Sequence, residues 1–238
     1  MSNTSLLLFF SLLPIVLILV IIYNLDRSKE PLILLLVFFV LGILSCFVVV
    51  EVSRLLAIVL PLMKKASSDL TFIEEIIYAF IGVALIEELC KWIVTYGIGY
   101  NNKEFDEIYD IIVYSVFMAL GFAFFENILY IFNIGELKVA IFRAILAVPA
   151  HASYAIFMGY YLSMAKQEKI KGNKKNEFKY TILSILVPTI LHGVYDYCLI
   201  SNVTILIEIF VIFIIGLDIL SIRKVKEMLL KNKSINIQ

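Results

Sequence analysis

The chain has 238 residues, of which 62% are hydrophobic, and its mean hydropathy is +0.98. A soluble domain is less apolar, with about half of its residues in this class. Its basic and acidic residues balance to a formal net charge of zero, which argues against a nucleic-acid-binding protein. The composition therefore predicts an all-α, polytopic membrane helix bundle, and we expect residues 1–238 to form a single integral membrane domain.

Apolar runs long enough to cross a bilayer recur along the chain and predict seven transmembrane helices. The first run lacks the basic start and the small-residue cleavage site of a signal peptide, so we expect a retained helix. A shorter run, Leu55–Met63, fits either an interfacial helix or a bent continuation of the second span that breaks at Pro61. The predicted spans are Ser5–Tyr23, Pro31–Val50, Ile76–Tyr96, Tyr109–Phe132, Val139–Met164, Tyr180–Leu199 and Val203–Ile222.

The basic residues predict the orientation of the bundle. With an odd number of spans, the first and third connections, the fifth connection and the C-terminal tail fall on the same side. Under the positive-inside rule that side is the cytoplasm, which places the N-terminus outside and the C-terminus inside. The second connection, with Arg54, Lys64 and Lys65, does not fit this arrangement. The residues that set the orientation are Arg27, Lys29, Lys103, Lys166, Lys169, Lys171, Lys174, Lys175, Lys179, Arg223, Lys224, Lys226, Lys231 and Lys233.

Three charged residues lie in the middle of the third predicted span: Glu87, Glu88 and Lys91. A charged side chain at the bilayer centre costs about 2.5–3.5 kcal/mol on insertion scales, so these groups should face protein or a water-filled cavity. Lys91 is spaced three and four residues from the two carboxylates and can neutralise either one. Charged residues in such a position mark a functional site by default.

Other ionisable residues lie inside predicted spans, and we single out four, which include the only two histidines of the chain. At about 1.5 Å of rise per residue, the polar groups of four spans fall within roughly 5–18 Å of the outer boundary, in one shared layer. Tyr130 lies one turn from the first of these residues, and the last two are also spaced one turn apart. The four residues are Glu126, His151, His192 and Asp196.

A carboxylate and an imidazole can together activate water and stabilise a tetrahedral intermediate, so this layer suits hydrolysis of a peptide bond in or beside the membrane. The same residues could bind zinc through Glu87, His151 and His192, although no HExxH motif is present. The spacing does not separate water activated by a glutamate from water activated by zinc. A purely structural alternative is an interhelical polar clamp without chemistry.

Four short motifs occur in a fixed order on successive spans. They are EExxK at Glu87–Lys91, FExxxY at Phe125–Tyr130, a segment from His151 to Gly159, and HxxxD at His192–Asp196. This ordered set, within about Ile76–Leu199, resembles the PrsW family of intramembrane proteases. That family is related to the CAAX prenyl endopeptidases and to the scaffold subunit of γ-secretase.

The resemblance implies site-1 cleavage of a membrane-anchored anti-sigma factor, a single-pass protein, at a bacterial plasma membrane. It further implies that Glu87 activates water with support from Glu88 and Lys91, although the choice between the two glutamates stays open. The second motif supplies Glu126 where the related endopeptidases have a histidine, so His151 becomes the candidate partner of the water. His192 and Asp196 are then the candidates for the oxyanion-binding and orienting roles.

Three other functions compete with the protease interpretation. A non-catalytic scaffold would use the same polar layer only to hold helices or a partner. A CAAX-type endopeptidase would cleave a prenylated protein instead of an anti-sigma factor. A transporter would use the acids and histidines as a proton relay, but it would more often show broken helices in repeated halves, and this sequence has no internal repeat.

Overall fold

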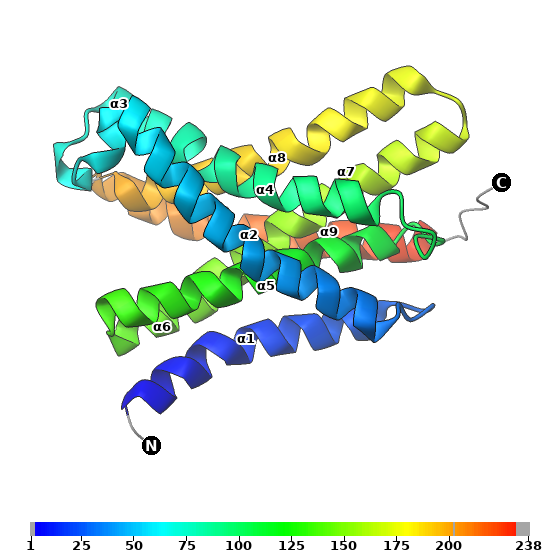
Figure 1. Cartoon of the computed structure of the whole chain (residues 1–238), viewed down its shortest axis with the longest axis horizontal. Coiled ribbons are helices and arrows are strands. Elements are labelled where there is room, and N and C mark those ends of the chain that lie inside the picture. Colours follow the sequence, from blue (N-terminus) through cyan, green and yellow to red (C-terminus); the bar gives the residue numbers. More distant parts are fainter. Residues whose placement is uncertain (1–2, 202, 232–238) are drawn as a thin grey trace.

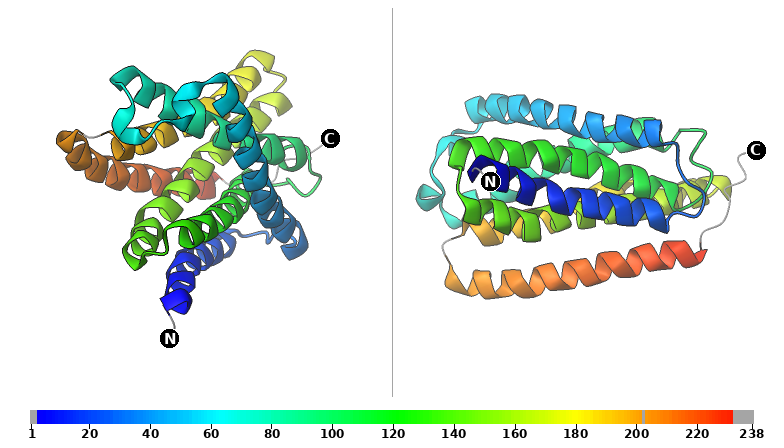
Figure 2. Two further views of the ribbon diagram at one scale, coloured as in Figure 1. Left: turned by 60° about the vertical axis from the view of Figure 1, so that its left-hand side comes forward. Right: turned by 90° about the horizontal axis from the view of Figure 1, so that it is seen from below.

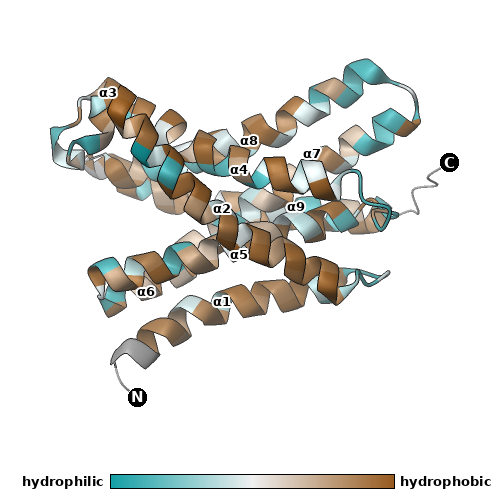
Figure 3. Ribbon diagram, viewed as in Figure 1, coloured by the Kyte–Doolittle hydropathy of each residue, from teal (hydrophilic) through white to brown (hydrophobic). Residues whose placement is uncertain are grey.

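The protein is an elongated bundle of helices whose long axes run roughly along the molecule (Figures 1 and 2). The computed structural model describes residues 3–201 and 203–231. Apolar residues dominate the helices, and polar residues gather at the connections (Figure 3), as expected for a chain that crosses a bilayer. The long helices are α1 (Asn3–Leu25), α2 (Leu32–Val59), α5 (Asp110–Ile134), α7 (Val148–Ile170), α8 (Lys174–Ile200) and α9 (Thr204–Lys231).

The third predicted span is helical but segmented. It consists of α3 (Phe72–Ile77), the wide π-type turns of η3 (Tyr78–Leu85), α4 (Ile86–Val94) and a second π-type segment, η4 (Thr95–Gly99). The fifth span is likewise built from α6 (Leu137–Phe142), a π-type segment η5 (Arg143–Ala147) and α7. Short π segments inside α-helices occur often at functional sites. All three adjoin a helix that carries candidate site residues.

Six continuous helical stretches in the described residues are long and apolar enough to cross a membrane. They correspond to six of the seven predicted spans, and the segmented helix over residues 72–99 takes the place of the seventh. The polytopic all-α fold is therefore confirmed. The short apolar run after the second span mostly continues α2, which ends at Val59, and Pro61 opens a separate turn, η1 (Pro61–Lys64).

Helix α5 forms the centre of the bundle and is buried along most of its length. It crosses α2 very closely, because glycine occurs on both sides of the contact. A Cβ atom on Gly121 would lie 2.0 Å from the carbonyl oxygen of Phe39, and one on Gly42 would lie 2.1 Å from that of Met118. Small residues let membrane helices pack backbone against backbone. This contact fixes the position of α5, which carries Glu126 into the site.

The basic segments share one end of the bundle. The α1–α2, α4–α5 and α7–α8 connections and the end of α9 lie at the right of Figure 1, opposite the start of α1. One basic residue of the predicted set, Lys233, lies outside the described residues. The assignment of this end to the cytoplasm stays a prediction from the positive-inside rule.

Cysteine labelling checks the orientation. In a variant whose native cysteines are replaced, Lys171→Cys should resist a membrane-impermeant maleimide in intact cells and react after permeabilisation. Lys138→Cys, near the start of α6 at the opposite end, should react in intact cells. Labelling of Lys171→Cys from outside intact cells would show that the orientation is the reverse of the predicted one.

Candidate active site

The charged triplet of the third span lies on α4 and points into the bundle. Glu88 and Lys91 are each only 1% exposed, and Glu87 is also buried. The Lys91 ammonium lies 2.8 Å from Oε1 of Glu88 and 3.3 Å from Oε2 of Glu87, so it pairs with both carboxylates. It also lies 4.2 Å from the ring centre of Phe122, a cation–π contact. Burial of the acids is thus compensated by a lysine one turn away.

The HxxxD motif on α8 meets this triplet directly. Nδ1 of His192 lies 2.9 Å from Oε1 of Glu88, and Nε2 lies 3.5 Å from Oδ2 of Asp196. Gly193 allows the approach, because a Cβ atom there would lie 2.3 Å from a ring carbon of Phe80 on η3. The glycine after the histidine therefore brings α8 close to the helix that carries the glutamates.

His151 on α7 joins the same network from the other side. Its Nδ1 lies 3.3 Å from the Lys91 ammonium, and its Nε2 lies 3.0 Å from Oε2 of Glu126 on α5. Because an ammonium can only donate, Nδ1 accepts and the ring proton is on Nε2, which donates to Glu126. The rings of His151 and His192 are 5.4 Å apart, edge to face. Four separate helices thus meet at one polar cluster, as expected from the shared layer of polar groups in the four predicted spans.

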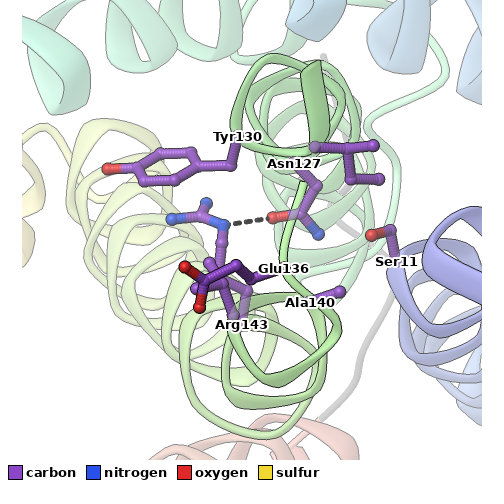
Figure 4. Close-up of a pocket in the computed structure, with 8 residues that line it drawn as sticks. Ser11, Asn127, Tyr130, Glu136, Ala140 and Arg143 are labelled. Carbon is purple, nitrogen blue, oxygen red and sulfur yellow. Dashed lines mark hydrogen bonds between the residues drawn. The ribbon is translucent and has the colours of Figure 1, made fainter. Parts of the chain in front are cut away.

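A further charged residue in this network, Arg143 on η5, was not among the site residues predicted from the sequence. Its Nη2 lies 2.7 Å from Oε2 of Glu126, and its Nε donates to Oδ1 of Asn127 at 2.6 Å. The guanidinium also covers the ring of Tyr130 at 3.9 Å, and Figure 4 shows these groups around a small neighbouring pocket. A single arginine within an apolar run was the available signal. Tyr130, placed on the site face by its spacing, contacts Arg143.

A cavity of about 820 Å³ opens beside the cluster. Glu87 lines it, whereas Glu88 and Lys91 do not, so the two neighbouring glutamates have different positions. Apolar side chains of α9 and η5, among them Phe210 and Leu146, form much of the remaining wall. The other predicted site residues that line the cavity are Glu126, Tyr130, His151, His192 and Asp196.

Tyr154 on α7 is a second residue that sequence analysis missed. Its ring stacks on His192 at 4.9 Å, and the residue lines the cavity. Its hydroxyl is buried and has no hydrogen-bond partner among the described residues. A buried donor without a partner beside a polar cavity is available to a ligand. Its position in the third motif, three residues after His151, was the signal in the sequence.

The best metal donor set differs from the one that the sequence suggested. Ligand atoms of Glu87, Glu88 and His192 all lie within 4.8 Å of one another, and His151 does not belong to this group. Two carboxylates and an imidazole are a zinc-type ligand set.

The net negative charge of the site and one unpaired oxygen of Glu88 are also consistent with a bound metal ion. Oε2 of Glu88 is buried without a hydrogen-bond partner among the described residues. With neutral histidines, the carboxylates of the site outnumber Lys91 and Arg143, and a divalent cation would balance the excess. The four carboxylates are those of Glu87, Glu88, Glu126 and Asp196.

The sequence profile described as PrsW family intramembrane metalloprotease matches residues 30–219. The chain belongs to the PrsW family. A relative named Protease PrsW from Clostridioides difficile (strain 630) is 34% identical over 214 residues, covering 88% of this chain and 86% of the relative. One from Oceanobacillus iheyensis is 37% identical over 198 residues, covering 81% and 83%. No solved structure matches.

Membership in the PrsW family makes the chain a membrane-embedded protease of the metalloprotease type and a multi-pass membrane protein. The resemblance seen in the four motifs is therefore confirmed. It also extends further than the motifs, because the matched residues include all of α2 and part of α9. Helix α9 carries no motif, yet it forms part of the cavity wall.

Proposed function

We propose that the chain hydrolyses a peptide bond of a membrane-anchored protein, with Glu87 as the carboxylate that activates water. The observation that carries this assignment is the position of the glutamate pair. Glu87 lines the cavity, while Glu88 lies behind it, paired with Lys91 and His192. A general base must reach the proton that it abstracts, and of the two only Glu87 lines the space where a substrate would bind.

The other residues take supporting roles in this proposal. Lys91 holds both glutamates by charge, and Glu88 in turn fixes the ring of His192. His151, held by Lys91 and Glu126, presents an oriented ring to the cavity and is the candidate partner of the attacking water.

Two groups suit the stabilisation of the tetrahedral intermediate. His192, which Asp196 orients from one turn away, lines the cavity. The Tyr154 hydroxyl lies beside it without a competing partner and can donate to the oxyanion. Preorganised donors of this kind typically contribute about 10²–10³ in kcat.

Alternatively, Glu87, Glu88 and His192 would hold a metal ion, and Glu87 and His192 would then serve as its ligands and not as base and oxyanion donor. When bound, zinc would polarise the scissile carbonyl and lower the pKa of its water. Its second coordination layer would come from Lys91 and Asp196, which contact the ligands and fix their orientation.

The proposed substrate is a single-pass protein of the anti-sigma-factor type in a bacterial plasma membrane. Two observations support a membrane-anchored substrate. The cavity lies within the helical bundle, and its wall from α9 is apolar, with Phe210, Ile214 and Ile215 among the lining residues. Such a wall suits a segment that arrives from the lipid phase. The anti-sigma-factor type rests on the motif resemblance.

Removal of the metal tests the metal part of the proposal. The purified protein, reconstituted with a candidate single-pass substrate, should lose cleavage on treatment with a zinc chelator and regain it when zinc is returned. Zinc content should approach one ion per chain in the wild type and fall in His192→Ala. Cleavage that survives complete removal of zinc would contradict the metal assignment and leave water activation to Glu87 alone.

A further inference from the structure

A second cluster of acidic residues lies away from the cavity, at the end of the bundle that carries the basic connections. Asp26 and Glu30 belong to the connection between α1 and α2, and Asp110 is the first residue of α5. One carboxylate oxygen from each lies within 4.8 Å of the other two. All three residues are buried, with exposures of 2%, 4% and 0%. None of them lines the active-site cavity.

The hydrogen bonds of this cluster leave two oxygens unused. Oδ1 of Asp26 accepts from the amide of Ser28, Oε2 of Glu30 accepts from the Tyr114 hydroxyl, and Oδ2 of Asp110 accepts from two amides of its own connection. Oδ2 of Asp26 and Oδ1 of Asp110 are buried and have no hydrogen-bond partner in the described part of the chain. Buried oxygens without partners are rare in native proteins, and each calls for an explanation, such as an ordered water or a bound ion.

No basic side chain among residues 3–201 and 203–231 forms an ion pair with these three carboxylates. The nearby Lys29 instead donates to the backbone carbonyls of Tyr23 and Asp26. Three buried carboxylates close to one another are poorly solvated and repel one another when charged. A bound cation would remove this unfavourable balance of charge.

We propose that Asp26, Glu30 and Asp110 bind a hard divalent cation, of the class of Ca²⁺ or Mg²⁺, at a site separate from the active centre. The donor atoms are all carboxylate oxygens, the ligands that these ions prefer, and the set has no histidine or cysteine of the kind that selects zinc. The ion would tie the α1–α2 connection to the first turn of α5. Since α5 carries Glu126, the site would stabilise the frame of the active centre from a distance.

Cation titration of the full-length protein tests this site. Purified protein is first stripped with a chelator, and Ca²⁺, Mg²⁺ or Zn²⁺ is then added while calorimetric binding and the thermal midpoint are recorded. We expect saturable binding of one Ca²⁺ or Mg²⁺ per chain with a rise in the midpoint. Asp110→Asn should weaken that binding at least tenfold, because it removes a charged ligand but keeps the oxygen that accepts from the two amides.

Two further variants keep the test decisive. Asp26→Asn provides a second ligand change should Asp110→Asn fold poorly, and Asp69→Asn is the control, an exposed acid in the connection between α2 and α3. Asp69→Asn should bind the cation as the wild type does. Without cation, Asp26→Asn should be at least as stable as the wild type, because one repelling charge is gone. Absence of Ca²⁺ and Mg²⁺ binding, or binding unchanged in both ligand variants, would overturn the proposal.

Discussion

Glu87→Gln is expected to reduce peptide-bond cleavage by about 10²–10⁴-fold, the usual contribution of a general base. Glutamine keeps the shape of the side chain but cannot accept the proton of water, and it is also a poorer metal ligand. Measurement requires reconstituted protein, a single-pass substrate and initial rates of product formation. Substrate binding, followed by co-purification, should survive the substitution, because the apolar wall of α9 is unaltered.

The matched control for this variant is Glu75→Gln. Glu75 is also a buried carboxylate on the helix of the third span, but it lies on α3 and does not line the cavity. The Glu75→Gln variant should cleave the substrate at the wild-type rate. If Glu87→Gln also cleaves at the wild-type rate, the base assignment is wrong. The chain would still be a protease, because its membership in the family rests on the sequence match. Such a result would therefore assign the role of base to Glu88 or Glu126.

Lys91→Met is expected to lower the free energy of unfolding by about 3–5 kcal/mol, the cost of leaving a buried charge without its partner. Lys91 is 1% exposed and contacts Glu87, Glu88 and His151, so its loss leaves two carboxylates facing each other. Methionine preserves most of the side-chain volume, which limits the effect to charge. Denaturation of the purified protein in detergent measures the change.

A second substitution separates charge from packing. In the double variant Lys91→Met/Glu88→Gln, a neutral amide replaces one of the two unpaired carboxylates, so part of the lost stability should return. Lys224→Met is the control, because its ion pair with Glu227 is about 30% exposed on both sides and should contribute only about 0–1 kcal/mol. Equal effects of Lys91→Met and Lys224→Met would show that the buried cluster adds no stability.

The spans could be predicted well because their signal is local. A run of about 20 apolar residues satisfies a bilayer wherever it occurs, so length and hydropathy suffice. The π-type turns of η3, η4 and η5 could not be predicted in this way. They change the rotation of a helix by a fraction of a turn without changing its composition. They depend on tertiary neighbours, because η3 packs mainly against α8, η4 against α5 and η5 against α1.

Most members of the polar cluster could also be predicted, because charge inside a membrane is costly and therefore conspicuous. The role of each member could not. Arg143 is such a charge, but its ion-pair partner Glu126 lies on another helix. The sequence around Arg143 does not identify that partner. Tyr154 is an ordinary aromatic residue in the sequence and gains interest only because it stacks on His192 beside the cavity.

The sequence by itself determined that this chain is a multi-pass helical membrane protein of the PrsW family with a polar layer inside it. Both properties depend on residue type and spacing along the chain. Only the tertiary structure decided that Glu87 faces the cavity while Glu88 turns toward Lys91 and His192, and that three distant acids meet at the other end of α5. These contacts depend on helix rotation and on close approach between helices, which spacing along one helix does not encode.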